Sequence, residues 1–287
     1  MSIGGLFKLT RFPLVFTAAA DSAVGAALVG VSLLHSTTWI PAVVASSLLY
    51  AGGMVLNDVA DLDRDRRIHP ERPLPSGRVD AGTAGLFATV LLFLAVAAAT
   101  LGGGTAFVWA AGMAAMIAGY DCVFKHISWA GAAAMAAIRG ANLGLGAVVA
   151  GADPRAAGFP WAPLAILAAF VFVLTLWSTR EERPQEGRGL LSLLGAGLVL
   201  VPLSGILLTR PVPWAAGAAS LWILPWVIRA MFRPERDRIM QAVRWGVLGI
   251  IPLDASFLAS NGRWPEAVVV AGLLIPALAL LPVFRKL

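Results

Sequence analysis

The chain has 287 residues, of which 59% are hydrophobic and only 13% are charged, and its mean hydropathy is +0.80. Water could not solvate so apolar a chain as one globular domain, so the composition excludes an ordinary soluble protein and predicts helices in a bilayer. The net charge of +6 favours contact with anionic lipid or a phosphorylated substrate. No basic-aromatic motif indicates nucleic acid, and the one cysteine, Cys122, lacks partners for a disulfide or a zinc site.

Ten apolar runs are long enough to cross the hydrocarbon core of a membrane. In chain order they cover residues 12–34, 38–56, 81–101, 105–120, 127–150, 160–177, 190–208, 212–228, 240–259 and 264–283. Several of these runs contain Gly or Pro, which membrane helices tolerate. The runs therefore predict an all-α, polytopic transmembrane bundle of nine to ten spans, with residues 1–287 forming a single domain.

The basic residues give an independent test of this topology, because cytoplasmic loops collect Lys and Arg. Most of the 22 basic residues lie in every second loop or at the chain ends, whereas the alternate loops hold only Arg155, Arg210 and Arg263. Both termini are then cytoplasmic, which requires an even number of spans. The richest charge cluster also falls on the cytoplasmic side.

This cluster directly follows the second apolar run. Asn57, Asp58, Asp61 and Asp65 come first, and an arginine-rich stretch that includes Arg72 follows. If the helix continues, the three carboxylates occupy positions i, i+3 and i+7 and share one face. A solvated charged loop is the alternative, but repulsion between like charges at a membrane edge favours a hard divalent cation among the oxygens. Mg²⁺ combines one or two carboxylates with phosphate oxygens, so the pattern predicts a diphosphate ligand.

The same stretch resembles the first motif of the UbiA superfamily of intramembrane prenyltransferases. Residues 57–65 match the family pattern Asn-Asp-x-x-Asp-x-x-x-Asp, and residues 70–78 resemble the segment that follows it. Weaker similarities lie further along the chain, at Tyr120, Asp121, Lys125, Arg139 and Asn142. The resemblance implies a nine-helix bundle, a Mg²⁺ cofactor and an isoprenyl diphosphate substrate with a small-molecule acceptor.

The second family motif is altered in this chain. Members usually carry another Asp-x-x-x-Asp cluster after the sixth helix, where residues 177–186 read Trp-Ser-Thr-Arg-Glu-Glu-Arg-Pro-Gln-Glu. Glu181 or Glu182 offers a longer carboxylate for a second cation, and Arg180 stands beside them. The altered motif resembles that of a bacterial subgroup related to the Ebo gene cluster, which implies that the protein lies in the bacterial inner membrane.

The resemblance further implies roles for individual residues. The diphosphate would lie at the cytoplasmic mouth, where metal, Arg and Lys charge stabilise the departing pyrophosphate, and an apolar pocket would protect the carbocation from water. The predicted metal ligands are Asp58, Asp61, Asp65, Glu181 and Glu182. The predicted catalytic residues are Asp58, Asp61, Asp65 and Lys125. The predicted substrate contacts are Asn57, Arg72, Tyr120, Asp121, Arg139, Asn142 and Arg180.

Three ionisable residues lie inside apolar runs, namely Asp21, Arg139 and Asp254. Such groups cost about 2.5 to 3.5 kcal/mol on insertion scales, so each requires a partner or a cavity. They either surround the substrate cavity or form an internal ion pair of Arg139 with one of the aspartates. Both alternatives stay open at the level of the sequence.

Three functions remain, and they differ in their products. The first is prenyl transfer to a small or lipid-like acceptor, and the second is a UbiA-type terpene cyclase in which the substrate's own double bonds capture the cation. The third is a non-catalytic lipid-binding or transport protein that uses the polar spans as a path. It leaves the spacing of the aspartates unexplained. Isoprenoid chain length, acceptor identity and oligomeric state are left open by the sequence.

Overall fold

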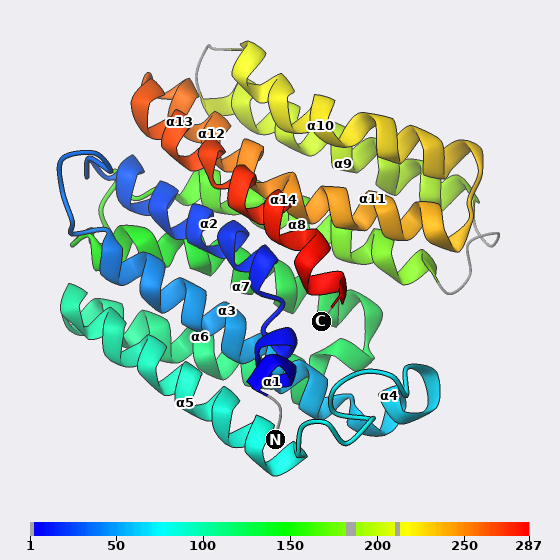
Figure 1. The fold of residues 1–287 in the computed structure, drawn as a ribbon. Helices are drawn as coiled ribbons and strands as arrows, with labels where there is room; N and C mark the ends of the chain where they lie inside the picture. Colours follow the sequence, from blue (N-terminus) through cyan, green and yellow to red (C-terminus); the bar gives the residue numbers. More distant parts are fainter. Residues whose placement is uncertain (1–2, 182–187, 210–212, 287) are drawn as a thin grey trace.

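The computed structural model describes residues 3–181, 188–209 and 213–286, which form helices and connecting loops (Figure 1). The first half comprises α1 (Ile3–Leu9), η1 (Phe12–Leu14), α2 (Val15–Leu28), α3 (Ile40–Ala60), α4 (Leu62–Ile68), α5 (Ala81–Ala99), η2 (Thr100–Gly102), α6 (Gly104–Cys122), η3 (Phe124–His126) and α7 (Ser128–Val149). The second half comprises α8 (Trp161–Ser178), η4 (Thr179–Glu181), α9 (Arg188–Thr209), α10 (Pro213–Phe232), α11 (Arg236–Leu248), α12 (Ile250–Ser260), α13 (Trp264–Gly272) and α14 (Leu274–Lys286). The all-α prediction is confirmed for these residues.

The long helices lie side by side in a bundle. Helices α5 and α6 run along one edge, and α9 and α10 run along the opposite edge (Figure 1). Between these edges, α2 packs on α3 and α7, and α8 packs on α7 and α9. Helix α12 packs on α2 and α10, which closes the centre of the bundle around α2. The inner helices therefore carry the side chains that can form a site.

Helices α2 and α7 approach each other closely enough for backbone contact. A Cβ at Gly25 of α2 would overlap the carbonyl oxygen of Leu143, and one at Gly146 of α7 would overlap that of Ser22. Small residues allow membrane helices to pack in this way without a solvent-driven hydrophobic force. The two glycines thus fix α2 against α7 and leave no gap between them at this level.

The predicted count of nine to ten spans is not confirmed. By length and apolar composition, six helical stretches of the described residues could cross a membrane, and two shorter apolar helices cover Gly189–Leu203 and Gly217–Phe232. The first expected span, 12–34, ends early because α2 stops at Leu28 and the chain turns at Gly30, whose φ is +101°. A helix of 14 residues is about 21 Å long, shorter than a hydrocarbon core of about 30 Å. The start of the expected span 212–228 lies outside the described residues.

Candidate active site

A cavity of about 340 Å³ lies among α2, α3, α6, α7, α8, α11 and α12. Its walls are mainly apolar, and the contributing side chains include Leu49, Met113, Ile138, Leu174 and Val247. The two tyrosines of the chain, Tyr50 and Tyr120, also line it. Polar groups gather at two levels, with Arg11 and Asp121 at one end and Ser46, Arg139 and Asn142 at the other. An apolar space with two polar ends is suited to a molecule that is itself mainly apolar.

The aspartate motif stands beside the end that carries Arg11 and Asp121. Helix α3 ends at Ala60, Asp61 forms the joint, and α4 begins at Leu62. The expected continuous helix is therefore interrupted at a single residue. Helical hydrogen bonds still cross this joint, because the Asp61 N–H donates to the Asn57 carbonyl at 2.9 Å and the Asp65 N–H donates to the Asp61 carbonyl at 2.8 Å.

Each motif aspartate is paired with a basic side chain from elsewhere. The guanidinium of Arg11, which precedes η1, donates to the Asp58 carboxylate at 3.0 Å. Asp61 lies 2.8 Å from Lys125 Nζ in η3, whose side chain is only 9% exposed. Asp65 lies 2.6 Å from Arg72 in the loop after α4. Three carboxylate–cation pairs thus stand beside the end of the cavity that carries Arg11.

A second contact joins the motif to the end of α6. The Asn57 amide donates to the Asp121 carboxylate at 2.7 Å, and Lys125 Nζ lies 4.0 Å from the same oxygen. Asp121 lies beyond the expected span 105–120, and burial raises the pKa of its carboxyl to about 6, against the lowering effects of Asn57 and Lys125. Four residues predicted for the site thus lie together at this end of the cavity, and Tyr120 lines the cavity wall. They are Asn57, Tyr120, Asp121 and Lys125.

The donor set fits Mg²⁺ in chemistry, although the carboxylates do not converge on one point. Within the described ranges, no three His, Cys, Asp or Glu side chains are close enough to hold a metal by themselves. The reason is that Asp58, Asp61 and Asp65 each lie against their own basic partner. Mg²⁺ usually takes only one or two protein carboxylates and fills its other positions with water and phosphate oxygens. Two of these aspartates would satisfy that requirement.

The altered second motif lies near the same mouth. Thr175 and Ser178 in the last turns of α8 line the cavity, and Arg180 follows in η4. The Arg180 Nε is buried and makes no hydrogen bond within the described part of the chain. The side chain of Glu181 and the whole of Glu182 lie outside the described residues. Their predicted role as ligands of a second cation stays a prediction.

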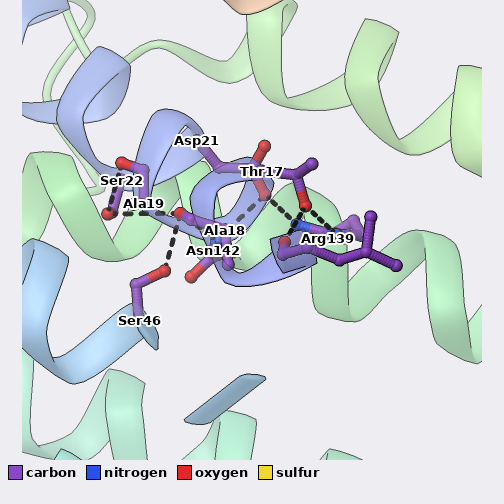
Figure 2. A network of polar contacts seen from close by, with 9 residues as sticks. Thr17, Ala18, Ala19, Asp21, Ser22, Ser46, Arg139 and Asn142 are labelled. Carbon is purple, nitrogen blue, oxygen red and sulfur yellow. Dashed lines mark hydrogen bonds and ion pairs between the residues drawn. The ribbon is translucent and has the colours of Figure 1, made fainter. Parts of the chain in front are cut away.

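The inner end of the cavity is organised by a buried ion pair (Figure 2). Arg139 of α7 donates to Asp21 of α2 at 2.8 Å and to Thr17 at 2.7 Å. The Asn142 amide donates to Asp21 and to the Ala18 carbonyl, both at 2.9 Å. Of the two alternatives for Arg139, the ion pair with Asp21 is therefore present, and Arg139 also lines the cavity.

Three residues of the site do not emerge from the sequence reasoning. Arg11 pairs with Asp58 across 47 residues, and Ser46 donates to the Ala18 carbonyl across 28 residues at 2.7 Å. Tyr50 lies under the Arg139 guanidinium, whose Cζ is 5.4 Å from the ring centroid. A basic residue directly before the first apolar run is a signal for Arg11, but membrane topology alone accounts for it equally well. Ser46 and Tyr50 carry no comparable signal.

A helical membrane bundle whose apolar cavity opens beside paired carboxylates and basic groups is suited to an apolar molecule with a charged head. Residues 14–182 match the model of the UbiA prenyltransferase family. Because this match covers more than half of the chain, the protein belongs to that family. The recognition of the family from residues 57–65 is confirmed, whereas its placement in the Ebo-related subgroup stays a prediction.

Similar proteins agree with this assignment. The digeranylgeranylglyceryl phosphate synthase of Sulfolobus acidocaldarius is 36% identical over 91 residues, which is 32% of this chain and 33% of that relative. The chain therefore matches about a third of the length of that relative. The synthase of Methanopyrus kandleri is 28% identical over 271 residues, which is 92% of this chain and 93% of that relative. A UbiA homologue from Archaeoglobus fulgidus, solved with GPP and Mg²⁺, shares the fold with a TM-score of 0.59 and 17% identity, covering 93% and 99% of the two chains.

Proposed function

We propose that the protein is a Mg²⁺-dependent intramembrane prenyltransferase. It ionises an isoprenyl diphosphate and transfers the prenyl group to a small or lipid-like acceptor. The observation that carries this proposal is the set of three carboxylate–cation pairs beside an apolar cavity of about 340 Å³. A diphosphate head requires the charged groups, and a prenyl tail requires the apolar walls.

The comparisons support the proposal in general terms. The relatives' names include a geranylgeranyl group and a glyceryl phosphate, and the homologue from A. fulgidus was solved with GPP and Mg²⁺. These facts favour a prenyl diphosphate donor, a magnesium ion and a glycerophosphate-type acceptor.

The proposed roles follow from charge. Asp58, Asp61 and Asp65 would hold Mg²⁺, which when bound supplies positive charge that stabilises the pyrophosphate leaving group. Arg11, Arg72 and Lys125 would exchange their carboxylate partners for phosphate oxygens, and each of them would then remain in an ion pair. Asn57 and Asp121 would hold Lys125 in place through the contacts already described.

The reaction then has two linked bond changes. The allylic C–O bond breaks, and its electron pair leaves with the pyrophosphate. The nucleophilic atom of the acceptor bonds to the freed carbon and loses its proton. The apolar wall, which includes Leu49 and Leu174, excludes water that would otherwise capture the cation.

Further roles and the cellular setting belong to the same proposal. Arg180, Tyr120, Arg139 and Asn142 would contact the substrate, and Glu181 or Glu182 would hold a second cation. Residues 1–287 would act as one domain, surrounded by membrane lipids, with the mouth facing the cytoplasm of a bacterial inner membrane. This orientation rests on the gathering of Lys and Arg in every second loop.

Product analysis tests the proposal. Purified protein in detergent is incubated with Mg²⁺, a prenyl diphosphate and a panel of glycerophosphate, aromatic and lipid acceptors, and pyrophosphate and organic products are both measured. A prenyl transferase gives one prenylated acceptor for each pyrophosphate released. A cyclised hydrocarbon formed at the same rate without acceptor would show a terpene cyclase instead. Mg²⁺-independent movement of an intact substrate would show a transporter.

A further inference from the structure

Asp254 of α12 is a buried carboxyl that the ion pair of Arg139 and Asp21 does not use. It is 0% exposed and lies about one helical turn after Ile250, which lines the cavity. Neither of its oxygens accepts a hydrogen bond within the described part of the chain. Burying a carboxyl without a partner is unfavourable, and far more so when the carboxyl is charged. Asp254 therefore requires a partner.

Asp21 of α2 is placed to be that partner. Its Oδ2 accepts from the Arg139 guanidinium at 2.8 Å and from the Asn142 amide at 2.9 Å (Figure 2). Its Oδ1 is buried and accepts no hydrogen bond among the described residues. Helix α12 packs on α2, and the Asp254 carboxyl lies within hydrogen-bonding reach of the Asp21 carboxyl. Two carboxyls thus meet with three oxygens that lack a donor.

Nearby donors are already engaged with other acceptors. The hydroxyls of Ser22 in α2 and Ser256 in α12 each donate to carbonyls of their own helix. The Asn142 amide donates to Asp21 Oδ2 and to the Ala18 carbonyl, which uses both of its N–H groups. A proton on one of the two carboxyls would supply the missing donor.

The balance of charge points to the same proton. The charged groups that act on Asp254 are Asp21 of α2 and Arg139 of α7. Two carboxylates beside one guanidinium would leave a net negative charge inside the bundle, whereas one added proton makes the group neutral. On the helices packed against α12, the other charged side chains that the structure describes are exposed or already paired, namely Arg229, Arg236, Asp237, Arg238, Arg244 and Glu266.

We propose that Asp254 is protonated and donates a hydrogen bond to Asp21 Oδ1, and that it thereby acts as a positioning residue for Arg139. The contacts run from Asp254 to Asp21 and on to Arg139, whose guanidinium lines the cavity and lies over the Tyr50 ring. A charged Asp254 would instead compete with Asp21 for the guanidinium. The effect on the reaction rests on the proposed function, in which Arg139 contacts the substrate, whereas the protonation does not.

Infrared spectroscopy of the purified protein in detergent tests the protonation directly. A protonated carboxylic acid has a C=O stretch that is separate from the carboxylate bands. At about pH 8, where exposed carboxyls are ionised, the wild-type spectrum minus that of Asp254→Asn should contain one such band. A difference spectrum without this band would overturn the proposal.

Thermal unfolding of two variants tests the hydrogen bond. Asp254→Asn keeps a donor for Asp21 Oδ1 and should change the Tm by less than about 2 °C. Asp254→Leu removes the donor with a side chain of similar size and should lower the Tm by about 3–12 °C, because Asp21 loses a hydrogen bond to a charged group. Ser256→Ala on the same helix is the control and should shift the Tm by less than about 2 °C. A Tm of Asp254→Leu equal to or above that of the wild type would overturn the hydrogen bond.

Pyrophosphate release then tests the positioning of Arg139, at a temperature where the variants are folded. Asp254→Leu should lower kcat/KM about tenfold or more, and Asp254→Asn should restore it to within about threefold of the wild type. Full activity in Asp254→Leu, or an equal loss in both variants, would overturn the positioning role and leave the proposed function standing. If the wild-type protein releases no pyrophosphate from any donor, the proposed function fails, and the infrared band still decides the protonation. Should Asp254→Leu not fold, the band and the Tm of Asp254→Asn decide the proposal.

Discussion

The pair of Arg139 and Asp21 predicts a large and asymmetric effect on stability. The two side chains are 8% and 0% exposed and lie 2.8 Å apart between α7 and α2. Removing one partner of a buried pair costs about 3–5 kcal/mol, because the other charge is left without compensation. Arg139→Met should therefore lower the Tm by about 6–20 °C, taking about 2–4 °C for each kcal/mol in a chain of this size class.

Thermal unfolding in detergent, followed by circular dichroism, measures this effect. Arg139→Met with Asp21→Asn removes both charges and should recover at least half of the lost stability, since replacing a whole buried pair is often close to neutral. A Tm change below about 2 °C for Arg139→Met would refute the reasoning. It would mean that water or another group compensates Asp21 when the guanidinium is absent.

Further predictions address packing and charge at other positions. Gly146→Ala should destabilise the protein by about 1–3 kcal/mol, because its methyl group would overlap the Ser22 carbonyl oxygen. Gly112→Ala, where a Cβ meets nothing within 4 Å, should be neutral or slightly stabilising, and thermal unfolding compares the two. Lys125→Met should lower kcat/KM for the prenyl diphosphate about 100-fold in a pyrophosphate-release assay, because the departing pyrophosphate loses one of its proposed cationic partners. Retention of full activity in Lys125→Met would show that Lys125 does not contact the diphosphate.

The aspartate motif and the polar residues of α7 could be predicted from the sequence because their signals are local. Asp58, Asp61 and Asp65 lie three and four residues apart, and helical geometry alone places them near one face. Arg139 stands out because a charge within an apolar run requires a partner. The sequence could not show which aspartate pairs with Arg139, since Asp21 and Asp254 both lie within apolar runs.

The remaining features depend on contacts between distant segments. The partner of Asp58 is 47 residues away, and that of Arg139 is 118 residues away. The first expected span is shorter in the structure because hydropathy does not register the turn at Gly30, which leaves α2 with 14 residues. The cavity could not be predicted either, because its lining residues come from seven different helices. Such relations exist only once the helices are packed.

The most direct test of the account is pyrophosphate release by the purified protein, with Mg²⁺ or with EDTA, for the wild type and two aspartate variants. Asp61→Ala removes the carboxylate that faces Lys125, whereas Asp63→Ala, in the same segment, removes a side chain that is 86% exposed and pairs only with Arg66 among the ion pairs described. The account predicts Mg²⁺-dependent release that falls about 100-fold or more in Asp61→Ala and persists in Asp63→Ala. Equal release by both variants, or release unaffected by EDTA, would contradict it.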